Sequence, residues 1–392
     1  MTEKIELDED ITNSVVKAFQ KGSAAGFAQS NSLFQYFGLA SNPFDHNILI
    51  DQPNLLIDKV NYIVTTLAER IGACFQGQTN LILISPEGVG RTSILKLINA
   101  TLNKGFDRHF CSYIDPRSEW YGLASEENED GERIDNFQKW SDSQDFTKTR
   151  IVLVDDADAF VSSARQYSDS INFDQIQAPT MVYCITPTTH SSVVMKNDQL
   201  KDIFGDFVWI MPLENHEIKQ ILFESLGNAK QGTNNSSFSP FDNAAIDRIV
   251  EYSIGLPGLA TWLAFLSLKS AHQLGIKKVD KTTVERVALV EGFATSLNVV
   301  QQQEKKLDGT KYNIAIEILI QFYITGNGVE RKNIISKFSN MATSTLSYHF
   351  KDLINDGIIK QERIGFRVLY SIPKPVRSAL QLLVLFPSSG GR

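Results

Sequence analysis

The sequence has few cysteines and no long apolar run. Its three cysteines, Cys74, Cys111 and Cys184, lie far apart, and no two of them have the C-x-x-C spacing. This usage argues against a disulfide framework and against a zinc site built on cysteine. No apolar run reaches the roughly 18 residues that a membrane-spanning helix needs, and the acidic start, MTEKIELDEDI, lacks the apolar core of a signal peptide. We therefore expect a cytoplasmic protein with no membrane partner.

Charge is distributed unevenly along the chain. The 392 residues, enough for two or three domains, have a net charge of −7. From Lys311 to the C-terminus, 11 Lys and Arg stand against 5 Asp and Glu, a net charge of +6, which leaves −13 for residues 1–310. Any contact with a polyanion is therefore expected from the C-terminal part.

The stretch Leu81–Leu97, LILISPEGVGRTSILKL, has the order of a strand, a glycine-bearing loop and an amphipathic helix. A loop of this kind places backbone N–H groups around phosphate oxygens, with a cation for the outer phosphates and a hydroxyl for Mg²⁺. We predict that ATP or ADP binds to this loop, and that the Thr92 hydroxyl binds Mg²⁺. The predicted nucleotide-binding residues are Pro86, Glu87, Gly88, Val89, Gly90, Arg91, Thr92 and Ser93.

Two positions of this loop depart from the GxxxxGK[ST] pattern. Ser85 replaces the first glycine, which a turn tolerates, and Arg91 replaces the lysine. A guanidinium group is larger than an ammonium group and planar, so the replacement keeps the charge but changes the geometry. We expect altered nucleotide binding and weakened or lost hydrolysis. A chance glycine-rich turn is the alternative interpretation.

Polar residues also follow two other apolar strands. The strand Ile151–Val154 runs into Asp155 and Asp156, and carboxylates at the end of a buried parallel strand hold Mg²⁺ and orient water in nucleotide-binding folds. We predict that Asp155 holds the metal through water and that Asp156 acts on the attacking water. Another apolar strand is predicted over Thr180–Thr186. Thr186 at its end, or else Thr188 just after it, would reach the γ-phosphate. A solvated acidic turn and an ordinary strand-to-loop turn are the alternatives.

The alternation of strands and helices predicts a doubly wound, mostly parallel α/β sheet with its ligand at the carboxyl ends of the strands. The predicted organisation is an N-terminal arm, a nucleotide-binding α/β domain with an acidic insertion, an all-helical lid, a linker and a C-terminal domain. The corresponding residues are 1–35, 36–213 with the insertion at 115–150, 214–300, 301–311 and 312–392. The insertion is expected to contact a protein partner or simply to be solvated.

The C-terminal residues have the order of a winged helix-turn-helix. Three helices, Tyr312–Tyr323, Arg331–Phe338 and Thr343–Asn355, precede a two-stranded wing with a turn near residues 363–365. Thr343 is the predicted N-cap of the third helix, which would enter the major groove of duplex DNA. The predicted DNA-binding residues are Arg331, Lys332, Ser344, Thr345, Ser347, Tyr348, Lys351, Arg363 and Arg367. A protein-docking module is the alternative.

Taken together, the Arg91 loop, the Asp155–Asp156 strand, the Thr186 strand and the helical lid resemble the AAA+ ATPases over roughly residues 36–300. Within them the chain is most similar to archaeal origin-recognition initiators and to transposon-type AAA+ DNA-regulating ATPases. This resemblance implies an arginine in a G-x-P-R motif of the lid and a subunit-bridging arginine before the last strand. The chain has Gly258 and Lys201 at these places.

The expected function is that of an ATP-binding, DNA-binding AAA+ protein, either a replication-initiator-like protein or a DNA-linked regulatory ATPase. Its cofactors would be ATP or ADP with Mg²⁺, and its partner would be double-stranded DNA; the resemblance also implies self-association through AAA+ faces. The substitutions at Arg91, Gly258 and Lys201 leave an inert scaffold that uses its winged helix for protein contacts as one alternative. A nucleotide-responsive transcription regulator is the other.

Overall fold

A computed structural model describes residues 33–44, 58–106, 110–114, 149–158, 161, 180–203, 206–230, 238–301, 309–325 and 328–385. Most of the predicted N-terminal arm and nearly all of the predicted acidic insertion lie outside these residues. No helix in the described parts of the chain combines the length and the apolar character that crossing a membrane requires.

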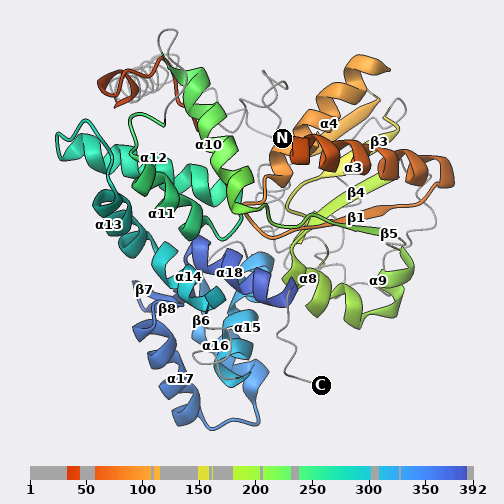
Figure 1. Cartoon of the computed structure of the whole chain (residues 1–392). Helices are drawn as coiled ribbons and strands as arrows, with labels where there is room; N and C mark the ends of the chain where they lie inside the picture. The colour runs from red at the N-terminus through yellow and green to blue at the C-terminus, as the bar shows by residue number, and fades with distance from the viewer. Residues whose placement is uncertain are drawn as a thin grey trace, which may run out of the picture.

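A five-stranded parallel sheet carries the first domain (Figure 1). Its strand order is β2-β3-β4-β1-β5, so every carboxyl end lies at the same edge of the sheet. This confirms the predicted doubly wound α/β architecture. The strands are β1 (Leu81–Ile84), β2 (Cys111–Ile114), β3 (Ile151–Val154), β4 (Thr180–Ile185) and β5 (Asp206–Trp209).

Helices cover both faces of this sheet because the side chains of its inner strands are apolar on both faces. Leu81 and Leu83 of β1 share a core with α3 (Asp58–Gly77) and α4 (Arg91–Gly105). Ile82 and Ile84 face the opposite side, where the short helices α8, η3 and α9 lie. Those three span Pro187–Ser192, Val194–Lys196 and Asp198–Ile203.

The predicted lid is a helical bundle whose core is continuous with the α3 and α4 side of the sheet. It comprises α10 (Asn215–Ala229), α11 (Asn243–Ser253), α12 (Pro257–Gln273), α13 (Lys281–Glu291) and α14 (Phe293–Gln301). The first two parts of the fold are therefore a parallel α/β sheet and a helical bundle.

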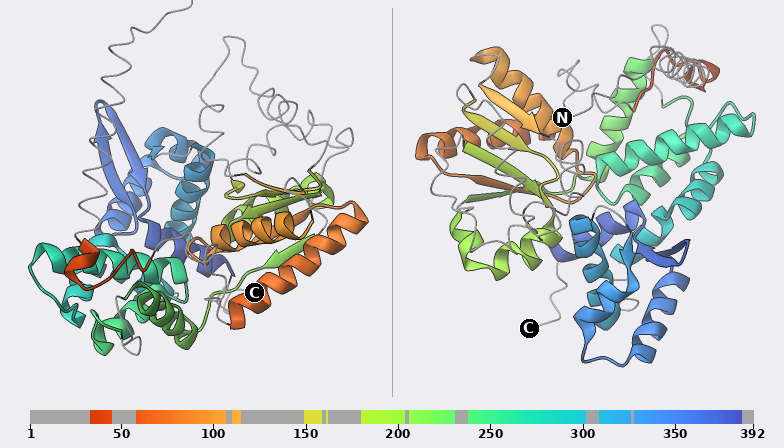
Figure 2. Two further views of the ribbon diagram at one scale, coloured as in Figure 1. Left: turned by 90° about the horizontal axis from the view of Figure 1, so that it is seen from above. Right: turned by 180° about the vertical axis from the view of Figure 1, so that it is seen from behind.

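The C-terminal domain consists of helices and an antiparallel hairpin, and it has a core of its own. The three-stranded antiparallel sheet has the order β6-β8-β7. The hairpin of β7 and β8 lies away from the five-stranded sheet (Figure 2, left). The elements are α15 (Gly309–Thr325), β6 (Val329–Glu330), α16 (Arg331–Ile335), η4 (Ser336–Phe338), α17 (Thr343–Asn355), β7 (Lys360–Ile364), β8 (Arg367–Ser371) and α18 (Lys374–Leu385).

One local prediction in this domain is wrong. Ala342, not Thr343, is the N-cap of α17, and no side chain caps the helix there. The extended backbone of Ala342 (φ −60°, ψ 139°) ends the preceding turn one residue earlier than predicted, so Thr343 is already helical. Its carbonyl oxygen accepts a hydrogen bond from the Ser347 hydroxyl at 2.6 Å.

The last helix, α18, connects the three parts of the molecule. It packs against α14 of the lid and against α8, which follows β4 of the parallel sheet (Figure 2, right). α15 also contacts α8. The C-terminal domain therefore lies at the carboxyl edge of the parallel sheet, where the predicted nucleotide site is.

Candidate nucleotide site and candidate nucleic-acid interface

The predicted phosphate loop joins β1 to α4 in a conformation that depends on glycine. Gly88 (φ 88°) and Gly90 (φ 97°) both have left-handed backbones, which glycine adopts without steric cost. Gly90 is the N-cap of α4, and because glycine has no side chain, no side-chain oxygen occupies the first N–H groups of the helix. This arrangement suits an anion.

The two predicted magnesium ligands meet in the structure. The Thr92 hydroxyl donates a hydrogen bond to Oδ2 of Asp155 at 2.5 Å, although 63 residues separate them. Asp155 is fully buried at the end of β3, and the Tyr113 hydroxyl donates to the same oxygen at 3.0 Å. A hydroxyl and a carboxylate at one point provide the oxygen ligands that Mg²⁺ prefers.

The predicted phosphate cation, Arg91, is paired with the carboxylates of β3. Its guanidinium group forms an ion pair with Asp156, and its Nε lies 3.7 Å from Oδ1 of Asp155. Burial alone would lower the pKa of Arg91, but the neighbouring Cys184, Asp155 and Asp158 hold this pKa above its ordinary value. Asp156 also has a left-handed backbone (φ 44°), which is uncommon for residues other than glycine. Arg91 therefore spans the loop and the acidic strand end.

Thr186 lies beside these carboxylates but binds another acid. Its hydroxyl and its backbone N–H donate to Oδ1 of Asp158 at 2.7 and 2.8 Å. Both residues are buried, and burial raises the pKa of Asp158. Thr188, the alternative to Thr186, is also buried. A role of Thr186 at a γ-phosphate stays a prediction. The sequence analysis missed Asp158, although the spacing Asp-Asp-x-Asp was a signal for it.

The lid touches the phosphate loop through the position where the resemblance implied an arginine. The N–H of Gly258 donates to the carbonyl oxygen of Gly88 at 2.7 Å. A Cβ atom at residue 258 would lie 2.9 Å from that oxygen. The glycine therefore permits a direct contact between the two backbones. Lys201, at the place of the implied subunit-bridging arginine, pairs with Asp198 of its own helix at 2.7 Å.

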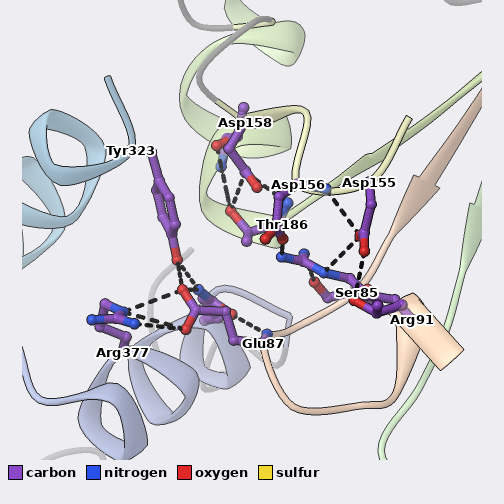
Figure 3. A network of polar contacts seen from close by, with 12 residues as sticks. Ser85, Glu87, Arg91, Asp155, Asp156, Asp158, Thr186, Tyr323 and Arg377 are labelled. Carbon is purple, nitrogen blue, oxygen red and sulfur yellow. Dashed lines mark hydrogen bonds and ion pairs between the residues drawn. The ribbon is translucent and has the colours of Figure 1, made fainter. Parts of the chain in front are cut away.

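Three side chains of the C-terminal domain reach the same loop, and the sequence analysis missed all of them (Figure 3). The Glu87 carboxylate accepts hydrogen bonds from Tyr323, Arg377 and Gln381, which follow it by 236, 290 and 294 residues. Figure 3 shows Glu87 between this group and the Arg91 carboxylate cluster. No local pattern could have indicated contacts over these separations.

Most of the predicted DNA-binding residues of α17 are exposed. Leu346, Phe350 and Leu353 are buried as predicted, and Ser344, Thr345, Tyr348 and Lys351 lie on the outer side of the helix. Ser347 and Arg331 differ, because the half-buried Ser347 accepts a hydrogen bond from Arg331. The Arg331 guanidinium also lies 5.6 Å from the ring centre of Phe350. Arg331 and Ser347 therefore hold α16 against α17, in addition to lying near the outer side of α17.

Several of the predicted DNA-binding cations make contacts within the domain itself. Glu330 of β6 forms ion pairs with Lys332 at 2.8 Å and with Arg367 at 3.5 Å. Nε of Arg363 donates to the carbonyl oxygen of Gly365 at 3.3 Å. Phe366, in the turn of the hairpin, is fully exposed. The sequence analysis did not select Phe366, although an aromatic residue after a turn glycine was a signal for a surface contact.

No protein-family model matches the chain. Among curated proteins, the chain is similar to an uncharacterised HTH-type transcriptional regulator of Methanocaldococcus jannaschii, with 23% identity over 238 residues, or 59% of this chain. The match covers 55% of that protein, so the chain spans about half the length of the curated relative it matches.

Three solved structures are similar over most of the chain. The ORC2 protein of Aeropyrum pernix, solved as ADPNP–ADP complexes, has 11% identity and a TM-score of 0.45, over 89% of this chain and 98% of that one. The ORC1 protein of the same organism, solved in complex with DNA, has 14% identity and a TM-score of 0.48, over 84% and 95%. The RuvB Holliday junction branch migration motor of Thermotoga maritima has 16% identity and a TM-score of 0.36, over 84% and 95%.

Proposed function

We propose that this chain is a nucleotide-binding, DNA-linked AAA+ protein. The observation that carries the proposal is the meeting of Thr92 with Asp155 beside a loop in which Gly88 and Gly90 have left-handed backbones. The oxygen donors fit Mg²⁺, and the glycine backbone with the start of α4 fits phosphate oxygens. A bound Mg²⁺–ATP or Mg²⁺–ADP would thus be held by the loop residues and by this pair.

Titration with labelled ATP, with and without Mg²⁺, tests this proposal. We expect saturable binding that Mg²⁺ strengthens in the natural protein, and loss of that Mg²⁺ dependence in D155N. D198N is the matched control, because Asp198 is an exposed carboxylate on α9 that pairs with Lys201. Binding that is absent, or equally dependent on Mg²⁺ in D155N, contradicts the proposal and favours an inert scaffold. Weak or lost hydrolysis stays a prediction that turnover of Mg²⁺–ATP decides.

The DNA contact is proposed for the outer face of α17 together with the wing. It is supported by the net charge of +6 from Lys311 onward and by the exposed Tyr348 and Lys351. Duplex binding should weaken steeply with salt, because phosphate contacts release counterions. A duplex affinity that does not change with salt contradicts this contact and favours protein docking.

Two biological roles fit such a protein. The resemblance to origin-recognition initiators favours a role in replication. The HTH-type relative is named a transcriptional regulator, which favours a role in transcription. Mapping of bound genomic DNA separates them, since an initiator collects at one or a few origins and a regulator at many promoters. Self-association through the AAA+ faces and a protein partner for residues 115–150 stay predictions, and the insertion lies almost wholly outside the described residues.

A further inference from the structure

The loop residue Glu87 is enclosed by the C-terminal domain. Arg377 of α18 donates from Nη2 to Oε2 of Glu87 at 3.1 Å and from Nε to Oε1 at 3.2 Å. Nε2 of Gln381 donates to Oε1 at 3.4 Å, and the Tyr323 hydroxyl of α15 donates to the same oxygen. The side chains of Glu87 and Arg377 are only 11% and 17% exposed. This cluster of four residues, the Glu87 latch, closes one side of the phosphate loop (Figure 3).

A side-chain oxygen of the C-terminal domain also binds a backbone donor of the loop. The N–H of Glu87 donates to Oε1 of Gln381 at 2.6 Å, and Gln381 is fully buried. Loops of this kind bind phosphate oxygens with their backbone N–H groups. Gln381 therefore occupies the N–H of Glu87, which could otherwise donate a hydrogen bond to a phosphate oxygen.

The latch offers no net positive charge to a polyphosphate. The Arg377 guanidinium and the Glu87 carboxylate form an ion pair that is neutral as a whole, so the charge of Arg377 is not available to a phosphate at the loop. Arg377 is itself fixed, because its Nη1 donates to the carbonyl oxygen of Ile372 at 3.1 Å and its guanidinium lies 4.5 Å from the ring centre of Phe322. The latch thus fills one side of the loop with a neutral ion pair and binds one of the loop's N–H groups, where phosphate binding needs available cations and free N–H groups.

We propose that Tyr323, Arg377 and Gln381 belong to the nucleotide site and compete there with the nucleotide phosphates. Docking of α18 on Glu87 and binding of a nucleoside polyphosphate then exclude each other, and nucleotide releases the C-terminal domain from the loop. The inference rests on the proposed nucleotide binding. Coupling between two binding equilibria is reciprocal. If nucleotide increases the affinity of a partner that holds the C-terminal domain away from the loop, that partner therefore increases the affinity for nucleotide by the same factor.

The test compares the affinity for Mg²⁺–ATP of the full chain with that of the double variant R377L/Q381L, which keeps much of the side-chain volume but removes the polar contacts. We expect the variant to bind about 5- to 150-fold more tightly, the usual range of such coupling. R248L is the matched control, since Arg248 forms an ion pair with Glu285 within the lid and touches no residue of the latch. Its affinity should equal that of the natural protein.

A second experiment measures the position of the C-terminal domain directly and does not depend on nucleotide affinity. Spin labels at the exposed Lys59 of α3 and Lys351 of α17 report the distance between the sheet domain and the C-terminal domain. We expect this distance to change in the natural protein on addition of Mg²⁺–ATP, and to be changed already in R377L/Q381L. If that variant does not fold, E87Q provides the same test, because a neutral amide weakens the pairing with Arg377; it should also bind ATP more tightly.

The outcomes separate the inference from the proposed function. Equal or weaker ATP binding in the latch variants, with saturable binding in the natural protein, overturns the competition and leaves nucleotide binding intact. Absence of saturable binding in every variant overturns the nucleotide site itself and the inference with it. Tighter binding in the latch variants but not in R248L, with the change in label distance, supports the competition.

Discussion

The N–H of Gly258 at the start of α12 donates to the carbonyl oxygen of Gly88 in the phosphate loop at 2.7 Å. The lid therefore contacts the loop through a backbone hydrogen bond, and the side chains of Leu256 and Leu259 lie beside Gly88. A Cβ at residue 258 would lie 2.9 Å from that oxygen and 3.0 Å from the Cα of Gly88. These distances are shorter than the contacts that Cβ atoms ordinarily make with neighbouring atoms. The absence of the lid arginine that the AAA+ resemblance implied thus has a steric reason.

G258A should separate the lid from the loop. The added methyl group is expected to cost about 1–3 kcal/mol, as overpacking of a filled site does, and to lower the melting temperature in calorimetry. G72A is the matched control, because Gly72 is also helical and nothing lies within 4 Å of its ideal Cβ. That variant should be neutral or more stable by about 0.5–1 kcal/mol. Equal melting temperatures for G258A and the natural protein would show that the contact is loose.

R91M should destabilise the carboxyl edge of the sheet. Loss of the buried guanidinium leaves Asp155 and Asp156 without their cation, which typically costs about 3–5 kcal/mol. Adding D156N should recover part of this loss, and a double-mutant cycle measured by calorimetry gives the coupling. R70M is the control: Arg70 and Asp206 form an exposed pair at 3.6 Å, and its loss should cost about 0–1 kcal/mol. Strictly additive effects of R91M and D156N would contradict a direct pairing.

The sequence predicted those parts of the fold that short patterns determine. β1 and β3 have the predicted bounds because each is an apolar run of four residues that is buried on both faces. Thr92 and Asp155 meet as predicted because parallel strands bring their carboxyl ends to one edge. The inward residues Leu346, Phe350 and Leu353 of α17 follow the helical period.

The remainder depends on how the domains pack, which no local pattern records. Glu87 was predicted to bind nucleotide, but its partners Arg377 and Gln381 come from a helix about 290 residues away. Arg91 was predicted to face phosphate, and only the position of β3 beside the loop shows that the Asp156 carboxylate pairs with it. The N-cap at Thr343 was wrong because one residue more or less in a turn leaves the sequence pattern almost unchanged.

E330Q should strengthen binding to duplex DNA. Glu330 pairs with Lys332 of α16 and with Arg367 of β8, so its neutralisation frees these two cations to bind phosphates. We expect a several-fold higher affinity and a salt dependence that is steeper by about one unit for each additional phosphate that the domain binds. Fluorescence anisotropy at several salt concentrations measures both. E362Q is the control, because it removes the same charge from β7, the other outer strand of the same sheet, all of whose residues are exposed. An equal rise in affinity in E362Q would attribute the effect to net charge.

The docking of the C-terminal domain should weaken in acid. Burial alone would raise the pKa of Glu87, but Arg377 and Tyr323 hold it below the ordinary value of 4.5. Because this pKa is lower in the folded protein than in the unfolded chain, the ionised carboxylate contributes stability at pH values above 4.5. That contribution is lost as the pH falls through the folded pKa. The distance between labels at Lys59 and Lys351 should therefore change on acidification, in the range below pH 4.5.

In E87Q the same labels should report the released position throughout this range, because the glutamine cannot ionise. The control is E285Q: Arg248 lowers the pKa of Glu285 in the same direction, but Glu285 lies in the lid and not in the latch. Its curve should follow that of the natural protein. An acid transition in E87Q that coincides with the natural one would mean that a different carboxylate holds the domain. A transition that only E87Q lacks attributes the acid release of α18 from the loop to Glu87.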